Sequence, residues 1–392
     1  MSELSQRLRS LDVFRGLTIA GMIVVNDPGS WAYVYPPLRH ADWHGITPTD
    51  FVFPFFLFIV GVSIVLAYSK RLKSDVSHAP LIGKIFKRSG IIFGLGLLLW
   101  LIPNFDFGGL RIPGVLQRIA LVFLSCSILF LKTTWRTQLY LMMGLLLGYW
   151  AMLSLIPVPI DEVIAAALQS GEVPSQAGPL AIGSLSKISD GFIAANLEPG
   201  ANLEAWLDRA VIPGRLWQYS WDPEGLLSTL PSIGSGLSGM MVGHILLSRK
   251  KSIDKVVFLF IAGFLAFAIG NVWGWFFPLN KNLWSSSFVL YTSGLATMTL
   301  AALYWWIDVE EKGTHNRFFF FCQVFGANAI TAYVLHGLFA RFYGGVTSFW
   351  METGMGLGLS GEFASLLFAL SYTMFIYLFA WILWKRKIFI KV

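Results

Sequence analysis

Charged residues are scarce in this sequence of 392 residues. Only 13% of the residues are charged and 55% are hydrophobic, whereas soluble domains carry about 25% charged residues. This composition excludes an ordinary soluble domain and predicts a membrane protein. The 33 Phe and 16 Trp residues suit lipid-facing and interfacial positions.

Cysteine is also nearly absent. The two cysteines, Cys126 and Cys322, both fall in apolar runs, so the sequence offers no disulfide framework and no CxxC metal spacing. We expect two inert packing thiols and no metal. The sequence also has no Walker loop, HExxH or GxSxG motif. Soluble nucleotide, metalloprotease and serine-hydrolase chemistries therefore have no sequence support.

Ten apolar runs are long enough to cross a bilayer. A lipid-buried segment must satisfy its own backbone hydrogen bonds, so each run is expected to be helical. We predict an all-α, polytopic transmembrane bundle of about ten helices, formed by residues 1–392 as a single domain. The long segment 157–224 is predicted to be an extracytoplasmic cap with short surface helices. The runs cover residues 11–27, 49–69, 89–103, 112–131, 137–156, 225–247, 255–277, 283–307, 317–339 and 364–384.

Basic residues gather on one side of the predicted membrane. If the N-terminus is cytoplasmic, twenty of the 29 Lys and Arg residues fall in inside segments and seven in outside segments. This asymmetry follows the positive-inside rule and predicts that both termini are cytoplasmic. It also explains the net charge of +7 without a nucleic-acid partner. Membrane lipid is the partner that the composition implies.

The first run begins with charged residues, which are costly beside apolar segments and therefore indicate a site by default. Asp12 and Arg15 are three residues apart and can share a helix face. They form either a structural ion pair or, with Arg7 and Arg9, part of a site for an anionic ligand at the cytoplasmic face. Further cations precede the third run on the same predicted side: Lys84, Lys87 and Arg88.

The loop between the first two runs carries the candidate acid–base groups. Either His40 or His44 could transfer protons near neutral pH, and either could be a solvated loop residue. Asn26, at the end of the first run, could cap the helix or belong to a site. Asp50, at the start of the second run, suits the helix dipole as well as a site. Trp43 could anchor in the membrane interface.

Two further polar groups stand out in the middle of the chain. Gln117 and Arg118 lie inside the fourth run, where a guanidinium requires a partner or a water-filled cavity, which favours a site. Asp222 and Glu224, at the outer end of the sixth run, either cap that helix or bind a polar or cationic ligand. Four glycines in the sixth run predict close helix packing: Gly234, Gly236, Gly239 and Gly243.

The last third of the chain gives weaker indications. A polar outside turn precedes the eighth run and is formed by Asn280, Lys281 and Asn282. Asn328 and His336, in the ninth run, either tie helices together or belong to a site. The basic C-terminal KRKIFIKV is most simply a topology anchor. A basic inner mouth and an acidic outer mouth together suit two classes of function, a transporter or an enzyme that transfers a group across the membrane.

Five blocks, RLRSLDVFRG, LRHADWHGITPTDFVFPFFLFIVGVS, GVLQRIA, DPEGLLSTLPSI and NKNLWSSSFV, are spread in this order over most of the chain. They resemble the transmembrane acetyltransferase family that modifies the terminal glucosamine of heparan sulfate in lysosomes, and its bacterial NagX-type relatives. The lysosomal enzyme carries a lumenal domain before its first helix, and we expect no such domain in this protein. We therefore expect glucosamine or a small glucosamine-containing sugar as the acceptor, rather than a heparan polymer.

The resemblance implies cytoplasmic acetyl-CoA as co-substrate, an amino sugar on the periplasmic side, a bacterial inner-membrane location and a possible homodimer. It implies His40 as the catalytic histidine, because His40 fills the histidine position of the HAxWxG block, with Asn26 near the transferred acetyl group. It places four residues near CoA: Arg7, Arg15, Gln117 and Arg118. The local sequence adds Asp50 to the catalytic group. It adds Arg9, Lys87 and Arg88 to the CoA group, and assigns the sugar to Trp43, Asp222, Glu224, Asn280, Lys281 and Asn282.

The chemistry of the predicted reaction fits these residue types. A free amine attacks a thioester once it is deprotonated, and an oxyanion develops in the transition state. An imidazole is suited to take the proton, and an amide such as Asn26 can stabilise the oxyanion. We favour His40 as the base over a transiently acetylated His40. The alternatives are an amino-sugar or N-acetylglucosamine transporter and an acyltransferase acting on a cell-envelope glycan.

Overall fold

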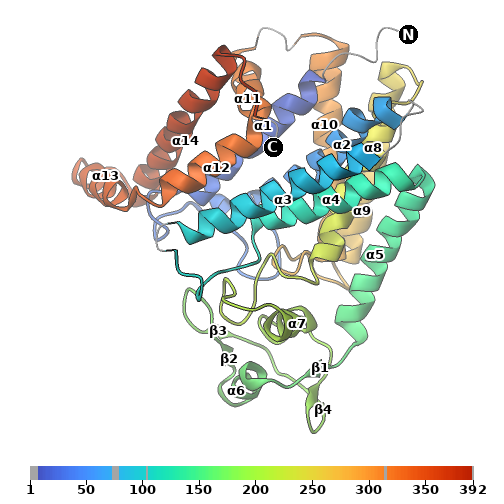
Figure 1. Cartoon of the computed structure of the whole chain (residues 1–392). Coiled ribbons are helices and arrows are strands. Elements are labelled where there is room, and N and C mark those ends of the chain that lie inside the picture. Colours follow the sequence, from blue (N-terminus) through green and yellow to red (C-terminus); the bar gives the residue numbers. More distant parts are fainter. Residues whose placement is uncertain (1–7, 73–78, 103–104, 313–315, 391–392) are drawn as a thin grey trace.

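Helices form most of the protein, as the long apolar runs predict. The computed structural model describes residues 8–72, 79–102, 105–312 and 316–390. In Figure 1, long helices form a bundle and a small lobe lies at one end of it. The helices are α1 (Arg9–Asn26), α2 (Val52–Leu72), α3 (Ala79–Leu101), α4 (Val115–Lys132), α5 (Trp135–Leu155), α6 (Glu162–Ser170), α7 (Leu203–Val211), α8 (Thr229–Leu246), α9 (Ser252–Trp273), α10 (Ser286–Tyr304), α11 (Arg317–Ala327), α12 (Ala329–Ala340), α13 (Gly344–Gly356) and α14 (Gly361–Lys385).

Each of the ten predicted runs overlaps a helix, and residue 103 of the third run lies outside the described residues. Within the described ranges, six helices are long and apolar enough to cross a membrane, or seven if a bent pair counts as one span. The prediction of a helical, multi-pass membrane protein is therefore confirmed, while ten spans and cytoplasmic termini stay predictions. The six candidate spans are Pro48–Ser69, Val115–Lys132, Trp135–Leu155, Ser252–Trp273, Ser286–Val309 and Gly361–Lys385.

The ninth run departs from the prediction of one continuous helix. It forms α11 and α12, which meet at an angle of 81°. The break lies at Asn328, which is 2% exposed. Its side-chain nitrogen donates to the carbonyl of Ile388 at 3.1 Å, and its side-chain oxygen accepts from the amide of Ile390 at 2.9 Å. The side chain of Asn328, at the break between α11 and α12, thus binds the backbone of residues 388 and 390.

The centre of the bundle is the tight contact between α2 and α8. A Cβ atom on Gly61 would lie 1.9 Å from the carbonyl oxygen of Gly236, and one on Gly239 would lie 2.0 Å from that of Phe58. Only hydrogen fits at these positions, so the two backbones approach closely. The predicted packing role of the glycines in this run is confirmed.

Gly239→Ala is expected to destabilise this helix pair. The added methyl group would overlap the backbone of Phe58, and overpacking of this kind costs about 1–3 kcal/mol or more. Thermal unfolding in detergent should show a lower transition temperature. Gly148→Ala on α5 is the matched control, because a Cβ there meets nothing within 4 Å. An equal shift in both variants would contradict the packing role.

The N-terminus of α1 is capped by a residue from far along the chain. Asp308 lies in a single π-helical turn, η4 (Trp305–Val309), at the end of α10. Its two carboxylate oxygens accept from the backbone amides of Arg9, at 3.1 Å, and Ser10, at 3.0 Å. No side chain of α1 itself caps this helix. A carboxylate at a helix N-terminus satisfies unpaired amides and complements the dipole, so Asp308 fixes the end of α1 opposite the loop that carries His40.

Both cysteines are buried and free, which confirms the expectation of packing thiols. Cys126 lies on α4 against Gly236, and the backbone of Cys322 lies against Gly16 of α1. Each therefore stands at a close contact between helices.

The segment 157–224 forms the lobe beyond the bundle (Figure 1). It contains α6 and α7, as the predicted cap with short helices requires. It also contains short antiparallel strands that an all-α prediction omits, because they are only two or three residues long and depend on glycine turns such as Gly191, with φ 105°. The strands are β1 (Val158–Pro159), β2 (Glu172–Val173), β3 (Leu180–Ala181), β4 (Lys187–Ser189) and β5 (Phe192–Ile193), paired in the orders β1-β5-β4 and β2-β3.

Candidate functional site

His40 and Asp50 form a hydrogen-bonded pair in the loop between α1 and α2. The Nδ1 atom of His40 lies 2.7 Å from Oδ1 of Asp50. The Asp50 side chain is 1% exposed, and that of His40 is 35% exposed. A buried carboxylate can only accept a proton here, so Nδ1 carries the hydrogen and the lone pair of Nε2 is directed away from Asp50.

The local sequence explains why this pair forms. Pro48 begins a short 3₁₀-helix, η3 (Pro48–Phe51), that leads into α2, and Thr47 and Asp50 form a capping box around its first turn. The second carboxylate oxygen of Asp50 accepts from the amides of Thr47, at 3.0 Å, and Ala41, at 3.2 Å. Asp50 thus ties the residue after His40 to the start of α2 and orients the imidazole.

Lys281 is the third member of this group. Its Nζ atom lies 3.1 Å from Nδ1 and 3.2 Å from Nε2 of His40, and 3.9 Å from Oδ1 of Asp50. The sequence contains only a weak indication that the turn formed by residues 280–282 belongs to a site, but the backbone of this turn is tightly fixed. Asn280 is fully buried and its side chain accepts from the amide of Leu283 at 2.8 Å.

Trp284, which follows this turn, was not predicted as part of the site. It has a left-handed φ of 50°, which is rare for a bulky residue. The surroundings of Trp284 hold it in this conformation, because its ring packs against Phe53 and Phe288 and its Nε1 donates to the hydroxyl of Ser235 at 3.1 Å. A buried tryptophan that ends a polar turn thereby fixes the position of Lys281.

The electrostatic surroundings keep His40 neutral. Burial lowers the pKa of His40 below its ordinary value, and the positive charge of Lys281 lowers it further. The hydrogen bond and charge of Asp50, and the more remote charge of Glu224, act in the opposite direction. Burial likewise lowers the pKa of Lys281. A neutral imidazole with an unprotonated Nε2 is the form that can act as a base.

Lys281→Met is expected to raise the pKa of His40, because it removes a positive charge from beside the ring while Asp50 and Glu224 remain. NMR titration of isotope-labelled histidine should show His40 protonating at higher pH than in the wild type. Lys281→Arg is the matched control and should leave the His40 titration close to that of the wild type. A downward shift in Lys281→Met would contradict the assigned role of the charge.

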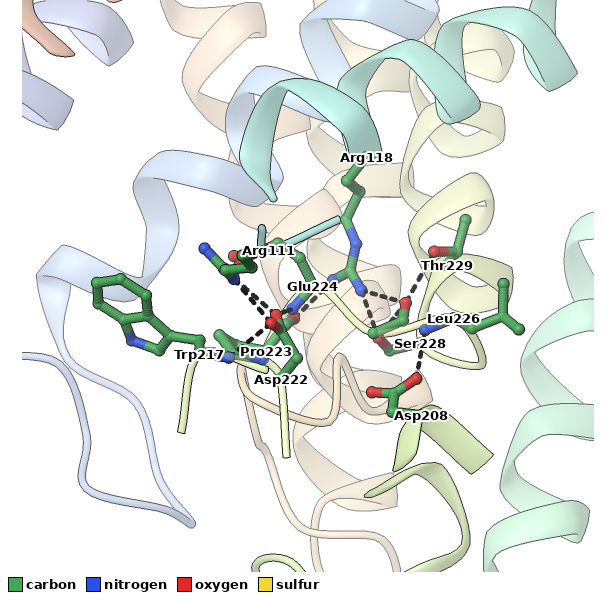
Figure 2. A network of polar contacts seen from close by, with 11 residues as sticks. Arg111, Arg118, Asp208, Trp217, Asp222, Pro223, Glu224, Leu226, Ser228 and Thr229 are labelled. Atoms are coloured by element: carbon green, nitrogen blue, oxygen red, sulfur yellow. Dashed lines mark hydrogen bonds and ion pairs between the residues drawn. The ribbon is translucent and has the colours of Figure 1, made fainter. Parts of the chain in front are cut away.

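Asp222 and Glu224, predicted to meet a ligand, are bound by Arg111 (Figure 2). Arg111 donates to both oxygens of Asp222, at 2.7 and 2.6 Å, and to Oε2 of Glu224 at 2.5 Å. Although burial opposes its charge, these two carboxylates raise the pKa of Arg111. Asp222 has a fully buried side chain and is committed to Arg111, whereas Glu224 is near enough to His40 and Lys281 for its charge to act on both.

Sequence reasoning missed Arg111. It was counted only as one of seven outside cations. The signal that could have found it is the DPE triplet at 222–224, since two acids so close together in a low-dielectric setting require a cation. Its ring contact with Trp217, 4.9 Å from the guanidinium carbon to the ring centroid, adds a further constraint.

Arg118 is 1% exposed and has partners in the same outer segment. Its guanidinium donates to the carbonyls of Pro223, at 2.9 Å, and Gly225, at 3.0 Å, and to the hydroxyl of Ser228 (Figure 2). The ring of Trp284 lies 5.2 Å away. The resemblance placed Arg118 near CoA, and that role stays a prediction. In the structure Arg118 lies beside the start of α8. It lies there because α4 begins beside this segment.

Two buried acids within the lobe were also missed. Glu204 and Asp208 are four residues apart on α7, and each has one carboxylate oxygen with no hydrogen-bond partner among the described atoms. Burial raises the pKa of Asp208 to about 7, and burial and the charge of Asp208 raise that of Glu204 well above its usual range. Protonated acids explain how both stay buried. The signal was the pattern LEAWLD, which puts both acids on one helix face.

Asn26 and Asp27 take opposite environments at the end of α1. Asn26 is exposed, and no hydrogen bond between it and His40 is found in the described part of the chain. Asp27 is 3% exposed and accepts from Nδ1 of His336 at 2.9 Å and from the hydroxyl of Tyr343 at 2.8 Å. His336 thus ties α12 to α1, which is the structural alternative that the sequence left open.

The other predicted sugar contacts have mixed surroundings. Trp43 is half-buried, and its Nε1 donates to the carbonyl of Leu197 in the lobe at 2.8 Å. Asn280 lies 3.3 Å from Nδ1 of His44, whereas Asn282 is half-buried with no described partner. Trp43 therefore links the histidine loop to the lobe.

The predicted CoA-binding residues that the structure describes have different surroundings, and their role stays a prediction. Arg15 donates to Asp12 at 3.3 Å, to the carbonyl of Gly326 at 3.2 Å and to Ser63 at 2.7 Å, so the structural ion pair is present. Arg7 lies outside the described residues, and Arg9 and Lys87 are exposed. Arg88 is exposed as well, and its guanidinium stacks over the ring of Phe123 at 4.6 Å. Gln117 is buried beside Gly96 and Gly114.

Comparison with known proteins points to one family. A sequence model described as "Heparan-alpha-glucosaminide N-acetyltransferase, catalytic" matches residues 7–167. The chain is 31% identical over 390 residues to the human protein named heparan-alpha-glucosaminide N-acetyltransferase, with 88% of this chain and 54% of that protein covered. The mouse protein of the same name is 30% identical over 375 residues, with 86% and 54% covered. The chain thus spans about half the length of the curated relatives it matches.

Proposed function

We propose that the chain is a membrane acetyltransferase of the heparan-alpha-glucosaminide N-acetyltransferase family, because the model of that family's catalytic region matches residues 7–167 and the human protein of that name is 31% identical over 390 residues. In this proposal it moves the acetyl group of acetyl-CoA to the amine of glucosamine or a small glucosamine-containing sugar. The observation that carries the proposal is the His40–Asp50 pair, in which Nδ1 lies 2.7 Å from Oδ1 and Nε2 is left to take a proton. Acyl transfer to an amine requires a base that can come within about 2.6–3.2 Å of the amine nitrogen.

In the proposed reaction His40 acts as a base in a direct transfer. The sugar amine reaches Nε2, gives up its proton there and attacks the thioester carbonyl carbon. The N–C bond forms, the C–S bond breaks, and the CoA thiolate leaves and takes up a proton. Asp50, hydrogen-bonded to Nδ1, holds the imidazole in the required tautomer and stabilises the imidazolium that forms.

Other residues have supporting roles in the proposal. The exposed amide of Asn26 donates to the oxyanion that develops on the acetyl group. Glu224, whose charge reaches His40, meets the incoming ammonium or a sugar hydroxyl. Asp222 keeps Arg111 and Glu224 in place. The two acids of the DPE triplet, Asp222 and Glu224, thus have different proposed roles.

We further propose that acetyl-CoA arrives from the cytoplasm and the sugar from the other side of a bacterial inner membrane. The α1 end held by Asp308 lies far from the lobe in Figure 1, and exposed cations such as Arg9 and Lys87 are available for the CoA phosphates. Inside-out and right-side-out vesicles test this orientation. Acetyl-CoA added outside should support transfer only in inside-out vesicles.

The test of the activity uses purified protein in detergent, acetyl-CoA and a thiol reagent. We expect free thiol to appear with glucosamine and not with N-acetylglucosamine, which differs in lacking the free amine. The same reaction should yield N-acetylglucosamine by mass spectrometry. No thiol release with either glucosamine or glucosamine-terminated oligosaccharides would overturn the proposal.

A transporter is the second candidate, favoured by the broken pair α11 and α12. Discontinuous helices often form substrate sites in transporters. Here the break has its own explanation, because Asn328 binds the backbone of Ile388 and Ile390. Uptake of radiolabelled amino sugar into proteoliposomes without acetyl-CoA would favour the transporter over the enzyme.

A further inference from the structure

Lys281 is an amine that lies against the proposed base. A base must be within about 2.6–3.2 Å of the atom whose proton it takes. The Nζ atom of Lys281 lies beside the imidazole of His40, 3.2 Å from Nε2 and 3.1 Å from Nδ1. Because Asp50 occupies Nδ1, Nε2 is the nitrogen that can take a proton from this amine. Among the described lysines it is the one in contact with His40.

The side chain is also held there. Lys281 is 17% exposed, and the buried Asn280 and Trp284 fix the turn that carries it. Burial lowers its pKa, while Asp50 and Glu224 oppose this and Arg118 adds to it. By contrast, Lys132, Lys187 and Lys250 are exposed lysines, without a contact to His40 among the described residues.

We propose that Lys281 is a self-acetylation site, modified from acetyl-CoA when no amino sugar is bound. This inference rests on the proposed function, because it uses the same donor and the same base. Nε2 of His40 takes a proton from Nζ, and Nζ attacks the thioester carbonyl carbon. The N–C bond forms, the C–S bond breaks, and CoA leaves as a thiolate that takes up a proton.

The modification has a consequence for the enzyme. An acetylated Lys281 has no positive charge and carries a bulky amide at the acceptor position. The sugar amine can then no longer reach Nε2, so the protein becomes inactive. A bound amino sugar occupies the same place and protects Lys281. Acetylation of Lys281 therefore indicates that the enzyme has bound acetyl-CoA in the absence of its acceptor sugar.

The experiment incubates the purified full chain with acetyl-CoA, with or without glucosamine, and maps acetylation by peptide mass spectrometry. Thiol release with glucosamine is measured on the same preparation. We expect one acetyl group on Lys281 without glucosamine and strong suppression with it. His40→Ala should slow this acetylation by about 10²-fold or more, the usual contribution of a positioned base. Lys187 reports the uncatalysed background.

A second readout uses Lys281→Arg, which keeps the positive charge and cannot form the acetyl-lysine. Each protein is incubated with acetyl-CoA alone, and the remaining transfer rate is divided by its own starting rate. The wild type should lose activity with time. Lys281→Arg should keep its starting value, whatever that value is.

The outcomes separate the two proposals. Thiol release with glucosamine together with an unmodified Lys281 overturns the self-acetylation and leaves the proposed function standing. Acetylation of Lys281 that equals that of Lys187, or that is unchanged in His40→Ala, also overturns it as chemical background. Absence of both thiol release and modification overturns both proposals. Modification of Lys281 without glucosamine turnover supports the site and contradicts glucosamine as acceptor.

Discussion

His40→Ala should lower the rate of acetyl transfer by about 10²–10⁴-fold, the range expected when a positioned base is removed. The physical reason is that the attacking amine loses the acceptor for its proton. Asp50, 2.7 Å from His40, cannot replace it, because its side chain is buried and one of its oxygens already accepts two backbone amides. The measurement is thiol release at saturating acetyl-CoA and glucosamine, followed over the pH range in which the wild type is active.

His44→Ala is the matched control for this prediction. His44 lies in the same loop and has Asn280 as its hydrogen-bond neighbour at 3.3 Å, without a carboxylate on its ring nitrogens among the described contacts. We expect a much smaller loss of rate. Equal losses in the two variants would show that the loop matters only as a whole and would remove His40 from its proposed role.

Arg111→Met should destabilise the protein by about 3–5 kcal/mol, the usual effect of removing one partner of a buried ion pair. The variant leaves Asp222, with a fully buried side chain, and Glu224, 9% exposed, without their shared cation. Thermal unfolding in detergent should therefore begin at a lower temperature. The effect follows from the uncompensated charge left behind rather than from a large net strength of the pair.

Two further variants test that explanation. Arg215→Met removes a guanidinium that contacts the exposed Tyr219, and it should shift the unfolding temperature far less. Asp222→Asn in the Arg111→Met background removes one stranded charge and should recover part of the loss. Stability that is unchanged in Arg111→Met, or a double variant less stable than Arg111→Met, would contradict the assigned role.

The sequence predicted the helices well because hydrophobic runs report directly on them. Each of the ten runs overlaps a helix, and the glycines between residues 234 and 243 correctly indicated a close contact. The bend at Asn328 was not predictable, because it depends on hydrogen bonds to residues about sixty positions further along the chain. The short strands of the lobe were missed since segments of two or three residues carry no periodic signal.

The candidate site was predictable only in part. The loop and its polar residues were evident, but preferring His40 to His44 required the family resemblance. The contact between Lys281 and His40 joins residues 241 positions apart, and local patterns contain no information about such pairs. For Arg118 the sequence correctly predicted burial and the need for partners. It did not identify those partners, which are the carbonyls of Pro223 and Gly225.

The hydrogen bonds of Asn328 also bear on the order in which the protein is made. The amide at the break between α11 and α12 is satisfied by Ile388 and Ile390, at the end of the described chain. A ribosome adds those residues about sixty positions after Asn328, and an unpaired amide is expensive in hydrocarbon. The bent pair therefore cannot form these hydrogen bonds until residues 388–390 have been made.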